Sequence, residues 1–388
     1  MSASENKLRL ANRAGRYVKQ PTGYKAFIPA KLPPNPPIKM DDELWALLSN
    51  ADRSLGRLDG ATEALPDPDL FVLMYVRKEA VLSSQIEGTQ ASLADVLEAE
   101  ADALGLNPLS DVDEVINYVA AMNHGLAQLP TLPLSARLMR DIHGRLLKGT
   151  RGDNLRPGEF RATQNWIGPQ GCTLKDAAFI PPPPDEVAAC MGDLERFIHD
   201  DAPMPLLMKV GLAHGQFETI HPFLDGNGRM GRLLITFLLC ERKVLSQPLL
   251  YLSHYLKRHR SKYYDLLQAI RDEGDWEGWM KFFLRGVAEV SDEATTTARR
   301  IVQLREEHLR LIGSNFGRST ANALKLLEEL FKRPIVQVNS VADLTHLAFP
   351  NANRLVSRFV ELGMLKEVTG RTRNRLFRYS PYIALFED

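Results

Sequence analysis

The sequence has few of the features that mark a disulfide-stabilised or membrane-spanning protein. Only three cysteines, Cys172, Cys190 and Cys240, occur in 388 residues, and their number and spacing suit neither a disulfide framework nor a zinc site. The longest strongly apolar run, residues 233–240, is far too short to cross a bilayer. Residues 1–20 mix charges throughout and lack the apolar stretch of an export signal. We therefore expect reduced thiols, no membrane contact and a cytoplasmic location.

An excess of one charge is also missing, because 48 Lys and Arg residues balance 48 Asp and Glu residues. This balance excludes a generally basic nucleic-acid coat and an acidic tail protein, although it leaves room for a local patch. The 44% hydrophobic content is that of an ordinary globular chain. A length of 388 residues suffices for two or three domains, and no internal repeat is visible.

Most of the chain has the periodicity of amphipathic helices. We expect helices at residues 41–58, 70–87, 93–104, 112–126, 135–147, 185–198, 206–220, 228–240, 260–272, 276–283 and 285–311. The opening should be irregular, with the five prolines of residues 27–38 forming an extended strap on the helical body. Turn residues within 149–184 predict a short surface β-hairpin over residues 164–180, and residues 313–317 (GSNFG) are expected to be a linker.

The last 72 residues have a different pattern. Short helices at 322–331, 340–347 and 351–362, followed by two strands within 364–379, predict a winged-helix module. From residue 317 on, 11 Lys and Arg residues outnumber seven Asp and Glu residues. Polar and basic side chains gather on the third helix and the expected wing: Asn351, Asn353, Arg354, Ser357, Arg358, Arg371, Arg373, Arg375 and Arg378. These residues suit contacts with DNA phosphates and bases, although such modules also bind proteins.

One segment, residues 221–232 (HPFLDGNGRMGR), gathers several polar functions between two apolar helices. Gly226, Asn227 and Gly228 lie where the second helix begins, so that backbone N–H groups and the helix dipole can receive an anion. Arg229 and Arg232 share one face of its first turn and suit a polyphosphate. In the same segment Asp225 offers a hard oxygen ligand for Mg²⁺, and His221 is a titratable base. Taken alone, GNGR also reads as a helix start with solvated charges.

The segment satisfies at every defined position the pattern H-x-F-x-(D/E)-G-N-(G/K)-R-x-x-R, and the chain therefore resembles the Fic (Fido-domain) family. The preceding AHGQFETI is also similar to that family, and the resemblance extends over about residues 27–313. It implies a mainly helical core with a β-hairpin flap. It also implies transfer of AMP from ATP to a Ser, Thr or Tyr hydroxyl of a target protein, with release of pyrophosphate.

The resemblance also assigns roles to single residues. It makes His221 the general base and Asp225 the ligand of Mg²⁺, the only cofactor that we expect besides the co-substrate ATP. The remaining ATP-binding positions that it implies are Gly226, Asn227, Gly228, Arg229, Gly231 and Arg232. Of the flap, Ile167 and Gly168 are expected to border the nucleotide, and Tyr263 and Tyr264 to contact adenine. Core packing is an equally open interpretation for one of the two tyrosines.

A second pattern, residues 83–88 (SSQIEG), matches the inhibitory pattern (S/T)-x-x-x-E-(G/N) of the same family. Ser83 and Glu87 are four residues apart on one helical face, and Glu87 lies at the end of that helix, where the dipole disfavours a carboxylate. The resemblance implies that Glu87 pairs with Arg232 and occupies the place of the γ-phosphate. In the plainer interpretation, Glu87 is an exposed residue before a Gly88 cap.

These expectations combine into one hypothesis for the whole chain. We expect an N-terminal Fic-associated helical region with the inhibitory helix at 1–133, a catalytic domain at 134–285, a connecting helix and linker at 286–316, and the winged-helix module at 317–388. The expected protein is an adenylyltransferase inhibited in cis by Glu87. Two further hypotheses remain open: a DNA-binding regulator with a nucleotide-sensing Fic domain, and an enzyme that removes AMP. Self-modification and assembly into a homodimer are open as well.

Overall fold

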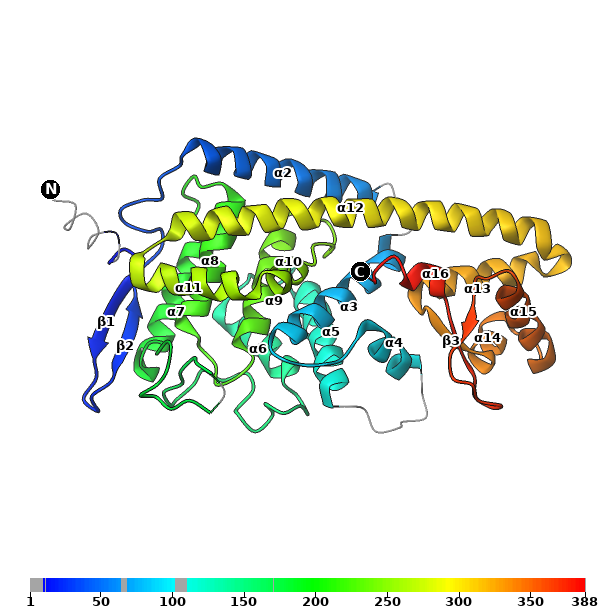
Figure 1. Ribbon diagram of the computed structural model, residues 1–388, viewed down its shortest axis with the longest axis horizontal. Helices are drawn as coiled ribbons and strands as arrows, with labels where there is room; N and C mark the ends of the chain where they lie inside the picture. Colours follow the sequence, from blue (N-terminus) through cyan, green and yellow to red (C-terminus); the bar gives the residue numbers. More distant parts are fainter. Residues whose placement is uncertain (1–9, 11, 64–67, 102–109, 170, 388) are drawn as a thin grey trace.

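The computed structural model describes the chain except for residues 1–9, 11, 64–67, 102–109, 170 and 388 (Figure 1). The molecule is elongated, with a large helical body at one end and a smaller C-terminal module at the other. None of the described helices is both long and apolar enough to cross a membrane. Helices make up most of both parts, as the apolar periodicity predicts.

The helical body contains eleven of the described helices. They are α2 (Asp42–Glu63), α3 (Pro68–Ile86), α4 (Leu93–Ala101), α5 (Ser110–Gln128), α6 (Ala136–Leu146), α7 (Pro184–His199), α8 (Leu206–Ile220), α9 (Asn227–Glu241), α10 (Ser253–Arg258), α11 (Arg260–Glu273) and α12 (Trp276–Asn315). In α8, every residue from Leu207 to Ile220 is buried. A helix that is buried all round lies in the centre of its domain, and α9 packs against it, so the loop between them starts deep in the core.

The long helix α12 joins the body to the C-terminal module, and α2 lies along it (Figure 1). We expected a break near residue 284 and a linker at residues 313–317, and both expectations were wrong. The helix continues through Leu284 and Gly286, which are buried, and ends only at Asn315. Gly286 packs against the Tyr255 ring, where a Cβ atom would clash. Its missing side chain therefore serves helix packing and does not mark a helix end.

The N-terminal opening is a β-hairpin and not the irregular segment that we expected. Strand β1 (Gly15–Lys19) pairs antiparallel with β2 (Lys25–Pro29). Residues 31–40, which hold four of the chain's prolines, follow without regular secondary structure and pack Leu32, Ile38 and Met40 against the core, as the strap hypothesis requires. The hairpin expected at residues 164–180 is reduced to one antiparallel bridge between Ile167 and Phe179. Its tip contains residue 170, which lies outside the described residues.

The C-terminal module contains the three short helices and two strands that the sequence predicts, plus a third strand. Its elements are η1 (Gly317–Ser319), α13 (Thr320–Lys332), β3 (Ile335–Gln337), α14 (Val338–Thr345), α15 (Phe349–Glu361), β4 (Lys366–Glu367), β5 (Leu376–Arg378) and α16 (Ser380–Ile383). The three strands form one antiparallel sheet in the order β3-β5-β4. The winged-helix assignment and the domain boundaries stay predictions.

Candidate active site at the start of helix α9

The loop between α8 and α9 is shaped by two left-handed residues. His221 ends α8 with φ of 49°, and Gly226, with φ of 73°, precedes the first turn of α9. A left-handed conformation is costly for a residue with a side chain, so its occurrence at His221 requires support from the surroundings. Arg161 supplies that support, because its Nε donates to the His221 carbonyl at 3.0 Å and its Nη2 to the Ile220 carbonyl at 3.4 Å.

Asn227 closes the loop on itself. Its Nδ2 donates to the Phe223 carbonyl and its Oδ1 accepts the Phe223 N–H, both at 2.8 Å. The Phe223 ring is fully buried and stacks on the His143 ring with 3.7 Å between centroids. Because the Asn227 side chain is used inside the loop, it is the backbone N–H of this residue, and not the amide, that is available to an anion.

The first turn of α9 presents its N–H groups to the site. Asn227, Gly228 and Arg229 are the first three residues of the helix, so their N–H groups have no acceptor within it. The Glu87 carboxylate lies against this turn, since a Cβ atom on Gly228 would clash with Glu87 Oε1. An anion already occupies the region where the helix dipole and free N–H groups favour one.

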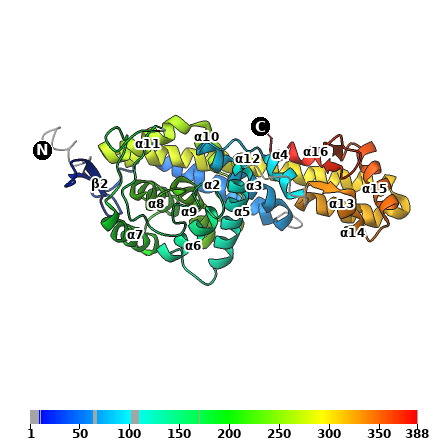
Figure 2. The same ribbon diagram turned by 90° about the horizontal axis from the view of Figure 1, so that it is seen from below.

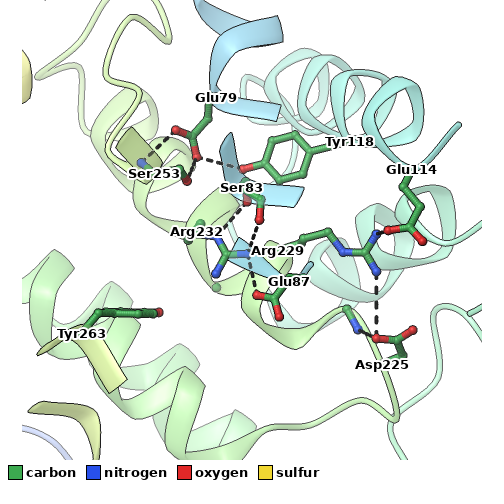
Figure 3. A network of polar contacts seen from close by, with 12 residues as sticks. Glu79, Ser83, Glu87, Glu114, Tyr118, Asp225, Arg229, Arg232, Ser253 and Tyr263 are labelled. Carbon is green, nitrogen blue, oxygen red and sulfur yellow. Dashed lines mark hydrogen bonds and ion pairs between the residues drawn. The ribbon is translucent and has the colours of Figure 1, made fainter. Parts of the chain in front are cut away.

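Arg232 bonds Ser83 and Glu87 through three hydrogen bonds (Figure 3). Its Nε donates to Ser83 Oγ at 2.7 Å, and its Nη2 donates to the Ser83 carbonyl at 2.9 Å and to Glu87 Oε1 at 2.7 Å. The arginine side chain is 2% exposed and the glutamate 32%. Burial lowers the pKa of Arg232, but Glu87 and the smaller contributions of the neighbouring tyrosines and Glu218 together outweigh it and raise that pKa well above its ordinary value. The structure thus pairs Ser83 and Glu87 with Arg232.

Arg229 points away from that pair. Its Nη1 donates to Glu114 Oε2 of α5 at 3.0 Å, and both side chains are 2% exposed. Its Nη2 lies 4.0 Å from Asp225 Oδ1. The guanidinium group therefore links α5 to the carboxylate at the loop mouth (Figure 3), and it is buried between them in this conformation.

His221 has the protonation state of a base. Burial, together with the positive charges of Arg271 and Arg161, lowers the pKa of its imidazole to about 3. Its Nδ1 is buried and has no hydrogen-bond partner among the described residues. A neutral ring can accept a proton, and the negative charge of a bound polyphosphate would raise this pKa toward the range that general bases use.

Asp225 fits the role of an Mg²⁺ ligand in its donor chemistry. Its side chain is 35% exposed, and its Oδ1 accepts the Gly226 N–H at 2.7 Å. The described residues include no cluster of three or more His, Cys, Asp or Glu that could hold a metal by itself. Mg²⁺ commonly takes one or two protein carboxylates and completes its shell with phosphate oxygens and water. The donor set here suits such an ion when it arrives with a nucleotide.

Of the two predicted adenine contacts, the structure places one in the core. Tyr263 is 1% exposed, and its hydroxyl lies 2.9 Å from His214 Nε2. Tyr264 is 38% exposed. Partial burial raises the Tyr264 pKa to about 12, and the negative charge of Glu87 contributes to the rise.

The other predicted positions lie around the loop. Gly231 of α9 faces α8, where a Cβ atom would clash with Glu218 Oε1. Ile167 takes part in the single bridge of the flap segment, and Gly168 packs against the Cys172 sulfur. Asn165 links this segment to the loop through a 2.8 Å hydrogen bond to the Phe223 carbonyl.

Several residues of the site were not found from the sequence. Glu79 of α3 accepts hydrogen bonds from the Ser253 backbone N–H, the Ser253 hydroxyl and the Tyr118 hydroxyl, and burial raises its pKa to about 7. Glu218 is 5% exposed, its Oε1 has no hydrogen-bond partner among the described residues, and burial raises its pKa to about 7. The spacing of Glu79, Ser83 and Glu87 at intervals of four is the one sequence signal that would have found Glu79.

Comparisons with known proteins show which family residues 45–239 resemble. The Fic/DOC family N-terminal model matches residues 45–127, and the Fic/DOC family model matches residues 133–239. A protein named "Protein adenylyltransferase Fic" from Culex quinquefasciatus is 31% identical over 240 residues, which are 58% of this chain and 44% of the relative. The protein of the same name from Drosophila melanogaster is 30% identical over 244 residues, which are 60% of this chain and 46% of the relative. The chain therefore spans less than half of these relatives.

Solved structures show the same fold. A Fic family protein from Desulfovibrio desulfuricans G20 superposes with a TM-score of 0.57 at 20% identity, over 88% of this chain and 97% of that one. A Fic domain-containing signaling protein from Bacteroides thetaiotaomicron does so with a TM-score of 0.50 at 18% identity, over 66% of this chain and 97% of that one. Two adjacent family models thus match this chain within residues 45–239, where it carries the Fic/DOC family N-terminal region and the Fic/DOC family region.

Proposed function

We propose that this protein is a protein adenylyltransferase that transfers AMP from ATP to a hydroxyl group of a target protein and is inhibited in cis by Glu87. The observation that carries the proposal is the contact of the Glu87 carboxylate with Arg232 and the first turn of α9. A carboxylate held there occupies a place suited to a phosphate group. The names of the relatives, which match the chain over about 240 residues, support the transfer activity.

In the proposed reaction, the target hydroxyl oxygen attacks the α-phosphorus of ATP, and the bond to the bridging oxygen of the β-phosphate breaks. Pyrophosphate leaves, and His221 accepts the proton of the hydroxyl. The backbone N–H groups of the α9 first turn and the guanidinium group of Arg232 stabilise the phosphate charges. Mg²⁺ held by Asp225 would neutralise further phosphate charge. No covalent enzyme intermediate is needed, because alignment and charge stabilisation supply the rate.

The inhibition follows from competition for one guanidinium group. While Arg232 is paired with Glu87 and Ser83, it cannot also receive the terminal phosphate of ATP, and a carboxylate beside that phosphate would repel it. The pair is partly exposed, so its separation is within reach of a binding event or a movement of α3.

ATP labelled on its α-phosphate tests the proposal. We expect Glu87→Gly to transfer label to itself or to lysate proteins at a higher rate than the wild type, and to bind ATP about tenfold more tightly by calorimetry. Adding His221→Ala should abolish transfer while ATP binding persists. Glu273→Gly is the matched control, since Glu273 also ends a helix before a left-handed glycine, Gly274, and should change neither property. If Glu87→Gly transfers no label in the presence of Mg²⁺, the proposal is wrong.

A second function, DNA binding by the C-terminal module, is favoured by the surface of α15. Asn351, Arg354, Ser357 and Arg358 are exposed on this helix, and Arg375 of the following loop bonds Asn353 Oδ1 at 2.8 Å. A solvated basic helix face beside a basic loop suits contacts with phosphates and base edges. A mobility shift on genomic fragments that persists at about 200 mM salt and is lost in Arg354→Ala would support it, whereas a shift unaffected by Arg354→Ala would contradict it.

A further inference from the structure

Helix α6 presents a basic hollow to solvent. The hollow has a volume of about 570 Å³, and four cationic side chains line it: Arg137, Arg140, Arg145 and Lys148. All four are exposed. The opposite face of α6, with Leu138, Met139, Ile142 and Leu146, is buried. Neither the sequence patterns nor the proposed transfer reaction uses this surface, which we call the α6 basic hollow.

The positive charge of the α6 basic hollow is largely uncompensated. The one acidic residue in its lining, Asp141, is already engaged by His124 at 2.5 Å and Arg145 at 3.9 Å. Neither Arg137 nor Lys148 has an ion-pair partner among the residues that the structure describes. In a chain with no net charge, this is a local concentration of cations, which attracts acidic partners.

The floor of the hollow is connected to the catalytic loop by a single side chain. The floor contains Gly144 and Gly158, and the Gly158 N–H donates to His143 Nδ1 at 2.9 Å. His143 Nε2 lies 2.9 Å from the Asp225 carbonyl. Because Nδ1 accepts, Nε2 carries the proton and donates to that carbonyl. Burial lowers the pKa of this ring to about 4, so the connection is neutral near pH 7. Helix α6 also lies beside α9 in both ribbon views (Figures 1 and 2).

We propose that the α6 basic hollow is a docking surface for an acidic segment of the target protein, which brings a hydroxyl near that segment to His221. This inference rests on the proposed transfer activity and specifies its substrate class. Lys148 and the flanking cations would hold carboxylates beside the loop, and Asn165 ties the flap segment to the Phe223 carbonyl of the same loop. Exposed charges at such a surface mainly accelerate association and select the partner.

The lining favours an acidic protein over a nucleic acid. Sites for single-stranded nucleic acid combine cations with aromatic side chains on which bases stack. No residue that lines the α6 basic hollow is aromatic. The four cations also lie along α6 and just beyond its C-terminal end, a short stretch that suits a short acidic segment better than a nucleic-acid backbone that needs many phosphate contacts.

Peptides of defined charge test the inference in the Glu87→Gly protein. Three peptides are used, one with a single Ser, one with a single Thr and one with a single Tyr. Each is made in a glutamate-flanked form and in a lysine-flanked form. Label transfer from ATP to each form is measured at low and at high salt. We expect about tenfold more transfer to the glutamate-flanked form of at least one peptide, reduced by salt. Arg137→Glu with Lys148→Glu should remove this preference by raising KM, while self-labelling and ATP affinity stay unchanged. The control, Arg299→Glu with Arg310→Glu on α12, makes the same charge change at exposed positions elsewhere and should leave the preference intact.

Binding of a fluorescent glutamate-flanked peptide, followed by anisotropy, is a readout that does not depend on turnover. If neither self-labelling nor peptide labelling occurs but the peptide binds in a manner that Arg137→Glu with Lys148→Glu abolishes, the transfer proposal fails and the docking surface stands. Equal transfer to both peptide forms, or equal effects of the α6 and α12 substitutions, overturns the docking surface. Tighter binding of a single-stranded oligonucleotide than of the peptide, lost on the same α6 substitutions, overturns the assignment to an acidic protein.

Discussion

Single hydrogen-bonding side chains decide whether the loop between α8 and α9 keeps its shape. Asn227 satisfies both the N–H and the carbonyl of Phe223, which lie in a buried environment. Arg161 does the same for the carbonyls that end α8. The shape of the loop therefore depends on two side chains whose hydrogen bonds are made to the backbone of the loop and of the end of α8.

Asn227→Ala should consequently lower both stability and transfer. It leaves the buried N–H of Phe223 without a partner, which costs about 1–3 kcal/mol, and it removes one of the two donors to the Phe223 carbonyl, which Asn165 still bonds. We expect a lower midpoint of thermal unfolding and, in the Glu87→Gly background, slower label transfer at saturating ATP. Asn351→Ala, at an exposed position of α15, should alter neither quantity. An unchanged unfolding midpoint in Asn227→Ala would show that water replaces the amide.

Glu218 should make stability depend on pH. Its pKa rises from 4.5 to about 7 on folding because of burial. The folded state therefore holds a proton that the unfolded state has lost between these pH values, and stability falls as the pH rises through that range. The cost above pH 7 is up to about 3 kcal/mol.

Glu218→Gln removes this titration. We expect urea unfolding to show the wild type gaining stability relative to Glu218→Gln when the pH is lowered from 8 to 5. A constant difference between the two proteins over this range would mean that Glu218 keeps an ordinary pKa in the folded state.

Helix α3 carries Ser83 and ends next to Glu87, and it is held at more than one point. Ser83 and Glu87 bind Arg232 of α9, while Glu79 binds Ser253 at the start of α10 and Tyr118 of α5 (Figure 3). Because these contacts lie at intervals of four residues, a shift of the helix would break them together.

Glu79→Gln should therefore loosen α3 without touching Glu87. The amide offers one acceptor where the carboxylate accepts from three donors, and its NH₂ group faces those donors. We expect label transfer several-fold above the wild type but below Glu87→Gly, with faster hydrogen exchange at residues 83–87. Asp52→Asn, the same change at an exposed position of α2, is the control. Faster transfer without faster exchange would contradict the account.

At the scale of elements, the sequence predicted the helices whose apolar residues follow a clear period. The bounds of α8 agree with the expected range of 206–220. Short strands such as β1 and β3 were missed, because a few residues carry too little periodicity to be distinguished from loops. The predicted pairing of Glu87 with Arg232 is observed, and the structure adds Ser83 to it. Glu114 and Glu218 could not be predicted, because their roles arise only when separate helices pack together.

At the scale of the whole molecule, the C-terminal module contacts α3, the helix that carries Ser83 and ends next to Glu87. The Phe386 ring meets the Tyr75 ring of α3 edge to face at 5.2 Å between centroids, and Tyr75 donates to the Ala294 carbonyl of α12 at 3.0 Å. His308 of α12 lies 2.6 Å from the Tyr379 hydroxyl. A partner that displaces the module would therefore act directly on α3.

Phe386→Ala should separate the module from the body in part. Removing a buried aromatic ring costs about 3–5 kcal/mol, and here the loss falls on a contact between two parts of the molecule. We expect calorimetry to show a new transition at lower temperature and limited proteolysis to cut near η1 more rapidly. Phe349→Ala removes a ring that is 54% exposed on α15 and should change neither result. If both variants unfold in one unchanged transition, the module and α3 are held together by contacts other than the Phe386 ring, and a partner on the module would have no route to Glu87 through it.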